Sequence, residues 1–201
     1  MKNLIGSAHS KLVFTRRMEA LVNAIAAWIP AGKALDVGCG NGMIAALVME
    51  RRPDVEIVGI DVLVRPDAVI PVQAYDGKTL PYEARSFDAV MVIDVLHHID
   101  DRAAALAECL RVVRGEVIIK DHFYRNPVEH LILRGLDWVG NAPHGVRLPY
   151  NYFTRPAWES TLKSIGAREI ERRESVTGMY PQPFQSVIGR NIQFMARLTP
   201  Q

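Results

Sequence analysis

The chain has little of what marks a secreted, membrane-spanning or polyanion-binding protein. It contains only two cysteines, Cys39 and Cys109, too few for a disulfide framework. Every apolar run is broken by Asn, Arg, Asp or Gly before it reaches the roughly 18 residues that a membrane span needs. Lys and Arg number 24 against 22 for Asp and Glu, so the charge indicates no general binding of nucleic acid.

The rest of the composition is typical of one globular domain. Apolar residues make up 49% and charged residues 23% of the 201, which excludes a disordered chain, a coiled coil and a collagen-like fibre. Residues 1–17 lack the apolar core of a signal peptide, and no Gly-, Ser- or Pro-rich linker divides the chain. We therefore expect a cytoplasmic single-domain protein, monomeric or homodimeric, whose partner is a small molecule.

Helix and strand patterns alternate along the sequence. Apolar spacing predicts helices over residues 16–29, 43–52, 102–113 and 158–165, and strands over residues 33–37, 55–60, 87–93, 116–120, 169–176 and 192–198. Strands rich in Val, Ile and Ala that alternate with helices indicate a largely parallel sheet covered on both faces. Such sheets bind ligands beyond the carboxyl ends of their strands, where this sequence concentrates glycines and acids.

A glycine-rich segment joins the first predicted strand to its helix. It reads Ala34-Leu-Asp-Val-Gly-Cys-Gly-Asn-Gly-Met43. Gly38 allows a sharp turn, Gly40 lets a ligand approach the backbone, and Gly42 opens the helix. The dinucleotide fingerprint G-x-G-x-x-G would need glycine where Met43 stands, and no G-K-[ST] of a phosphate loop follows.

This loop and three later segments resemble the motifs of class I S-adenosylmethionine-dependent methyltransferases. The matching segments are Leu35–Gly42 for the nucleotide loop, Val58–Asp61 for the acidic strand end that holds the ribose, Tyr75–Gly77 for the adenine side, and Ser86–Val90 with Asp94–Asp100 for the strand and loop that face the methyl group. The last of them is similar to the subgroup of ubiquinone and menaquinone C-methyltransferases. Together the four motifs are far more specific than any one of them.

The resemblance, which covers residues 30–121, implies a fold and a cofactor. The fold is an α/β, doubly wound, seven-stranded and mostly parallel sheet of the Rossmann-like methyltransferase type, with its last strand antiparallel. The implied plan is an N-terminal helical lid (1–29), a cofactor-binding core (30–121), a substrate-side insertion (122–157) and a C-terminal helix with strands (158–201). The cofactor is S-adenosyl-L-methionine and the product S-adenosyl-L-homocysteine.

The expected cofactor-binding residues follow the strand ends. They are Asp36, Gly38, Cys39, Gly40, Gly42, Asp61, Val62, Asp76, Gly77 and Asp94. The carboxylate of Asp61 can accept both ribose hydroxyls, and Asp76 can accept the adenine amino group while the Gly77 amide serves a ring nitrogen. Asp36 would lie near the ammonium group of the cofactor. Simpler roles stay open: a structural acid for Asp36, a strand terminator for Asp61 and a turn residue for Asp76.

Methyl transfer depends on holding nucleophile and methyl group in line, and it needs a base only when the acceptor must lose a proton. His97, His98 and His122 all follow predicted strand ends, and histidine has a suitable pKa for this task. The resemblance places His97 or His98 nearest the methyl group as the catalytic candidates, although either could simply pack the loop. Acids near residue 100 could join these histidines as metal ligands, but no H-x-x-x-H or C-x-x-C spacing appears, so we expect no metal.

The insertion over residues 122–157 gives the most information about the methyl acceptor. It is rich in aromatic residues, and a helix predicted over residues 131–139 presents an apolar surface. The candidate substrate residues are His122, Trp138, His144, Tyr150 and Tyr152. Such a segment could form a wall for an apolar small molecule, or it could merely fill a groove. The N-terminal helix could cover the cofactor or touch a membrane surface.

The sequence therefore predicts an S-adenosylmethionine-dependent methyltransferase that modifies carbon or oxygen of a small apolar molecule in biosynthesis. An inactive scaffold subunit is disfavoured by the intact glycines and both nucleotide acids, and a nicotinamide-dependent oxidoreductase by Met43. Methylation of protein or nucleic acid would predict a basic groove or an N-P-P-Y element. Neither is evident, because Asn126-Pro127 is not followed by Pro-Tyr.

Overall fold

The computed structural model describes residues 15–142, 145–176, 178–179 and 192–200. Within them one seven-stranded sheet runs in the order β3-β2-β1-β4-β5-β7-β6. The strands are β1 (Gly32–Val37), β2 (Val55–Asp61), β3 (Val72–Ala74), β4 (Phe87–Ile93), β5 (Val113–Asp121), β6 (Ala167–Arg173) and β7 (Phe194–Pro200). Strands β1 to β5 pair in parallel, and β7 is antiparallel to both β5 and β6. The predicted fold class is confirmed.

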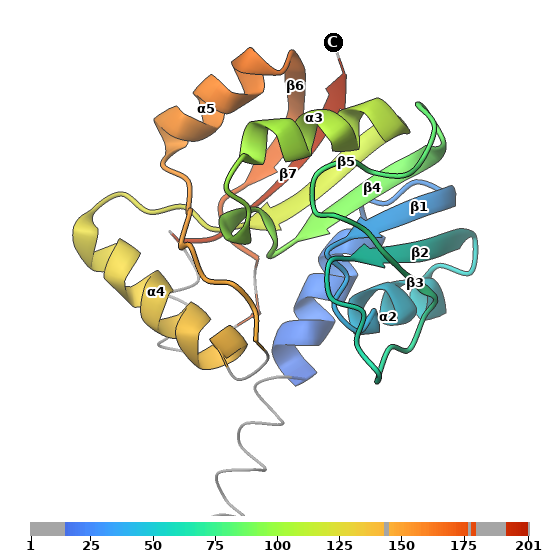
Figure 1. Cartoon of the computed structure of the whole chain (residues 1–201), viewed down its shortest axis with the longest axis horizontal. Coiled ribbons are helices and arrows are strands. Elements are labelled where there is room, and N and C mark those ends of the chain that lie inside the picture. Colours follow the sequence, from blue (N-terminus) through green and yellow to red (C-terminus); the bar gives the residue numbers. More distant parts are fainter. Residues whose placement is uncertain (1–14, 143–144, 177, 180–191, 201) are drawn as a thin grey trace, which may run out of the picture.

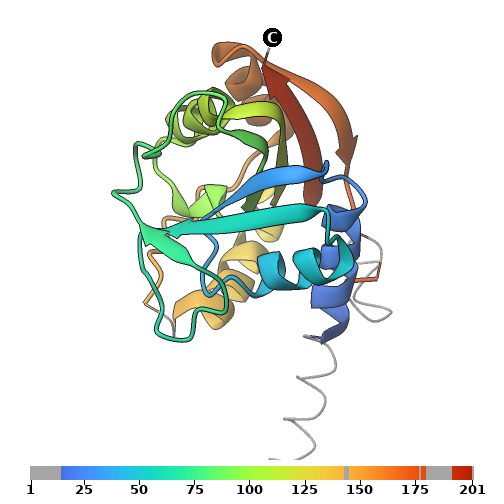
Figure 2. The same cartoon turned by 90° about the vertical axis from the view of Figure 1, so that its right-hand side faces the viewer.

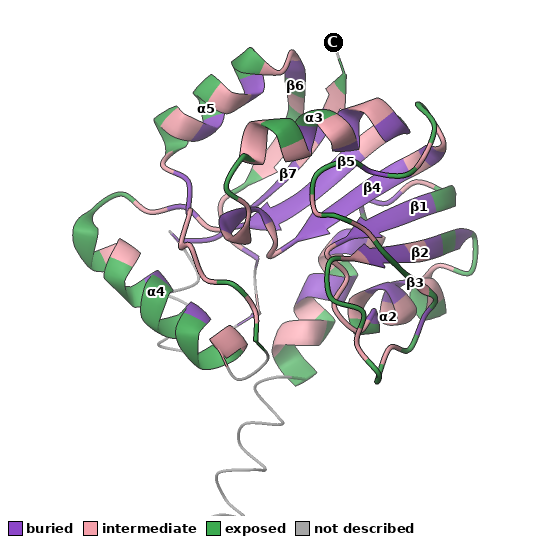
Figure 3. Cartoon of the chain, in the orientation of Figure 1, coloured by how far each residue is buried: buried purple, intermediate pink, exposed green. Residues whose placement is uncertain are grey.

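Helices cover both faces of this sheet (Figures 1 and 2). They are a helix over residues 15–26, called the N-terminal helix below, α2 (Met43–Arg51), the short 3-10 helix η1 (Leu96–His98), α3 (Arg102–Val112), α4 (Pro127–Asn141) and α5 (Arg155–Ser164). Helices α3 and α5 share one apolar cluster with the sheet, and the N-terminal helix and α2 share the other. Figure 3 shows that the central strands are buried between these two layers. None of the helices in the described ranges is long and apolar enough to cross a membrane.

Local capping explains where the helices begin. The side chain of Asp101 accepts a hydrogen bond from the backbone N–H of Ala104 at 2.9 Å, and Asn126 caps α4 through Glu129 at 3.0 Å. Such caps satisfy backbone N–H groups that a helix leaves without partners. Thr154 caps α5 in the same way, so that helix starts at Arg155 rather than at the predicted residue 158.

Some predicted bounds are wrong, and the reasons lie in tertiary pairing. The pattern missed β3, a three-residue edge strand that pairs only with β2 and is too short for a hydrophobic period. The last two strands lie at Ala167–Arg173 and Phe194–Pro200, instead of residues 169–176 and 192–198, because their mutual antiparallel register sets their ends. Helix α4 extends beyond residues 131–139 to Pro127–Asn141 since Asn126 caps it.

We expect Trp158→Ala to destabilise the fold by about 3–5 kcal/mol, the usual cost of truncating a buried aromatic residue. Trp158 is fully buried, its ring lies 4.9 Å from that of Phe194, and its Nε1 donates to Glu169 at 2.7 Å. Urea unfolding measures the loss. Trp138→Ala is the matched control, because that ring is 61% exposed and its loss should change stability by less than about 0.5 kcal/mol. Equal losses in the two variants would contradict the packing account.

Candidate functional site

The glycine loop leaves β1 in a backbone conformation that favours glycine. Gly38, Gly40 and Gly42 have φ values of 73°, 60° and 78°. A Cβ added at Gly38 would lie 2.6 Å from the Val95 side chain, and one added at Gly42 would lie 2.3 Å from Ile70. A Cβ at Gly40 would have no neighbour closer than 3.9 Å. Packing therefore requires Gly38 and Gly42, whereas Gly40 leaves its backbone open to approach.

Asp61 ends β2 and holds this loop. Its Oδ2 accepts a hydrogen bond from the Gly40 N–H at 2.8 Å, and its Oδ1 accepts one from the Leu63 N–H at 2.9 Å. Each carboxylate oxygen can accept a second hydrogen bond, so both remain competent to receive a ribose hydroxyl. Val62 follows with 64% exposure. The strand end thus combines the structural role and the geometry expected of a diol-binding acid.

Asp76 and Gly77 lie on the loop after β3. The Oδ1 atom of Asp76 accepts from the backbone N–H groups of Lys78 and Thr79 at 2.8 and 2.9 Å, so the simpler turn role is present. Gly77 has a φ of 77°, and a Cβ there would lie 3.0 Å from Val62. Gly77 therefore lies beside Val62, the residue that follows Asp61.

Asp36 is buried and Cys39 is half-buried. Burial, with a smaller contribution from Asp61, raises the pKa of Asp36 to about 7. Burial also raises the pKa of the Cys39 thiol to about 12. Cys39 is therefore a thiol at neutral pH and fills space near Gly59, where an added Cβ would lie 2.6 Å from its sulfur.

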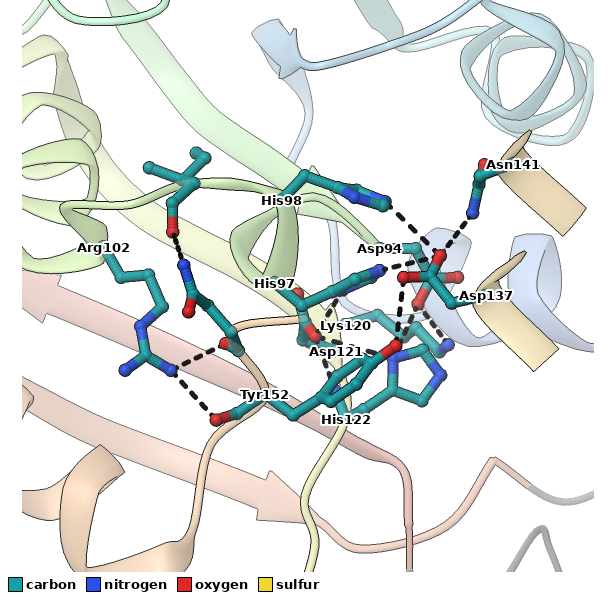
Figure 4. A network of polar contacts seen from close by, with 12 residues as sticks. Asp94, His97, His98, Arg102, Lys120, Asp121, His122, Asp137, Asn141 and Tyr152 are labelled. Atoms are coloured by element: carbon teal, nitrogen blue, oxygen red, sulfur yellow. Dashed lines mark hydrogen bonds and ion pairs between the residues drawn. The ribbon is translucent and has the colours of Figure 1, made fainter. Parts of the chain in front are cut away.

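A second group of charged side chains lies where β4 and β5 end (Figure 4). Asp94 follows β4 with a φ of 57°, and its Oδ1 accepts from the ammonium group of the buried Lys120 at 2.5 Å. Arg17 of the N-terminal helix reaches Asp94 Oδ2 at 3.4 Å. Although burial alone would raise the pKa of Asp94, Lys120 keeps it below its usual range. Asp94 is thus an ionised acid at the predicted position.

His97 lies on η1 and is paired with an acid that the sequence reasoning missed as a partner. Its Nδ1 is 2.8 Å from Asp121 Oδ1, and both side chains are buried. Burial alone would lower the pKa of His97, but the Asp121 carboxylate raises it to about 10. At neutral pH His97 is therefore an imidazolium with a proton on each ring nitrogen. This state disfavours its expected role as a base.

His122 differs from His97 although both contact Asp121. Burial, helped by the Lys120 charge, lowers the pKa of His122 to about 4. Its Nδ1 lies 3.5 Å from Asp121 and 3.6 Å from Asp94 and makes no hydrogen bond to the described residues. His122 is therefore a neutral imidazole at neutral pH, with a buried Nδ1 that has no hydrogen-bond partner among the described residues.

His98 and Asp137 complete the group. The Nδ1 atom of His98 is 2.9 Å from the Arg147 carbonyl oxygen, so it donates to that oxygen. Asp137, on the inner face of α4, accepts from Tyr152 Oη at 3.0 Å and from Asn141 Nδ2 at 2.6 Å. The sequence analysis missed Asp137. An acid one helical turn after the buried Leu133 is the signal that could have found it.

Several of these side chains form the floor of a cavity of about 490 Å³. Its polar lining comes from Asp94, His97, His122, Asp137 and Tyr152, and its apolar lining includes Leu21 of the N-terminal helix, Ile44 of α2, and Leu133 and Leu136 of α4. A cavity of this size, with apolar walls and a few convergent polar groups, fits a small organic ligand.

The cavity contains only some of the predicted substrate residues. His122 and Tyr152 line it. Trp138 does not: it is 61% exposed, because it lies one residue past the inward Asp137 and so about 100° further round α4. Tyr150 is outside the lining and packs beside Arg134, whose guanidinium carbon lies 4.7 Å from its ring centre. His144 lies outside the described residues.

Comparisons with known proteins bear on the family and the fold of this chain. A family described as a methyltransferase domain matches residues 35–119. A ubiquinone biosynthesis O-methyltransferase of Hahella chejuensis is 31% identical over 55% of this chain and 52% of its own length, so the chain spans about half of that relative. One of the same name from Thiobacillus denitrificans is 29% identical over 77% of this chain and 71% of its length.

A solved structure extends the agreement to the whole fold. The 1,6-didemethyltoxoflavin-N1-methyltransferase of Burkholderia thailandensis, with bound 1,6-didemethyltoxoflavin and S-adenosylhomocysteine, has a TM-score of 0.65. It is 20% identical and matches 100% of this chain and 87% of its own. The resemblance to class I methyltransferases is confirmed, and the family implies S-adenosylmethionine as cofactor. The comparisons do not favour an oxidoreductase or a scaffold.

Asp36 generates a pH-dependent prediction. Because the pKa of this carboxyl is raised by folding, its contribution to stability is fully present below about pH 4 and is lost as the pH rises through about 7. Asp36→Asn removes that titration. From pH 5 to pH 8 the free energy of unfolding of the variant should rise by about 2–3 kcal/mol relative to the unmodified protein. Urea unfolding at both pH values measures this; a difference independent of pH would contradict it.

Proposed function

We propose that this chain, whose residues 35–119 match a methyltransferase-domain family, transfers a methyl group from S-adenosylmethionine to carbon or oxygen of a small apolar molecule. The observation that carries the proposal is that the open glycine loop adjoins the cavity. Ile44, two residues after Gly42, lines the cavity, and Val95, beside Asp94, contacts Gly38. A donor on the loop and an acceptor in the cavity would therefore be neighbours.

The proposed donor site consists of the glycine loop and the three strand-end acids. Asp61 would accept the ribose hydroxyls, Asp76 the adenine amino group, and Asp36 would lie near the ammonium group of the cofactor. The support is their shared position at the carboxyl ends of β1, β2 and β3, the edge at which sheets of this type bind nucleotides. Asp94 would mark the end of the cofactor that faces the cavity.

The proposed acceptor site is the cavity itself. Leu21, Leu133 and Leu136 give it apolar walls, which suit an apolar ring or chain better than a charged metabolite. The relatives named for ubiquinone biosynthesis, and a demethylmenaquinone methyltransferase of Thermotoga maritima that is 32% identical over 43% of this chain, support an acceptor of quinone-precursor type. Tyr152 would contact it at the polar floor.

The proposed base is His122. It lines the cavity and is a neutral imidazole; because its Nδ1 is buried beside Asp94 and Asp121, its Nε2 would be the atom that accepts a proton from a bound hydroxyl. His97 is a poorer choice since its Nδ1 is engaged by Asp121. His98 is not part of the cavity lining, and its Nδ1 is engaged by Arg147. In-line placement of donor and acceptor would supply most of the rate enhancement.

The donor site is tested by Asp61→Ala. The variant should bind S-adenosylhomocysteine more weakly by about 1.5–3 kcal/mol, the range for hydrogen bonds to a charged group. Asp67→Ala is the matched control, because Asp67 lies on the same loop and contacts Asn41 rather than the glycine backbone. Calorimetric titration measures both affinities. Equal affinity of Asp61→Ala and the unmodified protein would refute the ribose role.

The base is tested by His122→Gln. Loss of a general base should lower kcat by about 10²–10⁴-fold while the affinity for S-adenosylhomocysteine changes little. Turnover is followed as release of S-adenosylhomocysteine with apolar phenol and quinol acceptors. His130→Gln serves as control, since that ring packs on Tyr124 and on the outer side of Tyr152 without itself lining the cavity, and its loss should change kcat far less. A kcat of His122→Gln equal to that of the control would remove the base from the proposal.

A further inference from the structure

Two imidazole rings point at one carboxylate oxygen in the cavity floor. The Nε2 atoms of His97 and His98 lie 3.7 and 3.8 Å from Oδ1 of Asp137 (Figure 4). Both distances exceed those of normal hydrogen bonds, which end near 3.2 Å. The three atoms nevertheless lie within 4.8 Å of one another. The separations of these atoms are therefore too long for a shared hydrogen bond and close to those between two ligand atoms of one metal ion.

The outer nitrogens of both rings are held by oxygen atoms. Asp121 Oδ1 lies 2.8 Å from Nδ1 of His97, and the Arg147 carbonyl oxygen lies 2.9 Å from Nδ1 of His98. An ion would replace the second proton of His97; with one proton left on each Nδ1, the lone pair of each Nε2 would then be directed toward Asp137. Histidines that bind metals almost always donate their other N–H to a carboxylate or a backbone carbonyl, and both forms occur here.

We propose that His97, His98 and Asp137 bind a divalent transition-metal ion, with Zn²⁺ as the best match. Two imidazoles and one carboxylate are a common catalytic zinc set, whereas Mg²⁺ and Ca²⁺ prefer oxygen ligands alone. Zinc bonds of 2.0–2.1 Å in tetrahedral geometry place ligand atoms about 3.4 Å apart, so small inward movements would complete the site. The sequence motifs did not predict it because Asp137 comes from a helix far along the chain.

The surroundings of the site suit a cation. Asn141 and Tyr152 hold the Asp137 carboxylate at 2.6 and 3.0 Å, which fixes its orientation. Asp121 stands directly behind His97, and its Oδ2 has no hydrogen-bond partner among the described residues. A bound ion would thus add positive charge next to two buried carboxylates, which would offset the cost of their burial.

A second possible ligand group, formed by His97, Asp121 and His122, is less suitable. The 2.8 Å contact between His97 and Asp121 is a normal hydrogen bond and leaves no room for an ion between the two atoms. Asp121 is therefore a positioning residue for His97. The ring of His122 remains free to serve as a base.

The ion has a role in catalysis if the proposed function is correct. His97 and Asp137 line the cavity, so its open coordination position would face the acceptor and bind a hydroxyl oxygen. The ion would lower the pKa of that hydroxyl, and His122 would take the proton. The oxygen would then form a bond to the methyl carbon while the carbon–sulfur bond breaks, its electron pair passing to sulfur. This favours oxygen as the methylated atom.

The test is metal binding by tag-free protein that has been stripped with a chelator. Calorimetry should show one Zn²⁺ per chain, and Co²⁺ should give visible absorption bands with nitrogen and oxygen donors. His98→Gln and Asp137→Asn should each weaken Zn²⁺ binding by at least about tenfold, and Asp121→Asn by about 10–100-fold. His130→Gln is the matched control and should bind as the unmodified protein does. Thermal unfolding checks that each variant is folded.

The proposal is overturned if Zn²⁺ does not bind, or if its affinity is the same in Asp137→Asn, His98→Gln and the control. The latter result would place the ion at other histidines. Titration of the same samples with S-adenosylhomocysteine separates this inference from the proposed function. Cofactor binding without metal binding refutes the metal site alone, and metal binding without cofactor binding supports the site and refutes the methyltransferase proposal.

Discussion

The ion pair between Asp94 and Lys120 is the interaction on which the cavity floor depends. These residues lie at the ends of β4 and β5, two adjacent central strands, and Lys120 is fully buried. A lysine in that position needs a carboxylate partner, since an unpaired buried charge is very costly. Its positive charge in turn keeps Asp94 ionised and adds to the burial that lowers the pKa of His122. His97 and His122 thus differ in protonation state. The Asp121 carboxylate outweighs burial at His97, whereas burial and the Lys120 charge prevail at His122.

Much of the fold could be predicted because its signals are local. The apolar strands, the glycine loop and the acids that follow the strands are all visible within short windows, and parallel strands bring their carboxyl ends together by geometry alone. The position of Asp61 at the end of β2 could be predicted from the apolar strand pattern alone. Edge strand β3 was missed since three residues hold no periodic pattern, and its pairing with β2 is a tertiary effect.

The candidate site was only partly predictable because its chemistry arises from contacts between distant segments. The sequence presents His97, His98 and His122 as similar candidates, and only the placement of Asp121 and Asp137 separates them. Aromatic composition indicated a substrate-side segment, but the turn of α4 decides that Asp137 faces the cavity and Trp138 faces outward. Which residues of α4 point into the cavity depends on how the helix packs against the rest of the molecule, and the sequence of the insertion alone does not determine this.

The most direct test of the account is whether the unmodified protein binds the methyl-donor product. Calorimetric titration with S-adenosylhomocysteine, and with NAD under the same conditions, compares the two cofactor classes that a glycine loop of this kind can serve. The account predicts binding of S-adenosylhomocysteine with a dissociation constant on the order of micromolar, about −8 kcal/mol, and no binding of NAD. Folded, ligand-free protein that binds NAD, or neither compound, would contradict it.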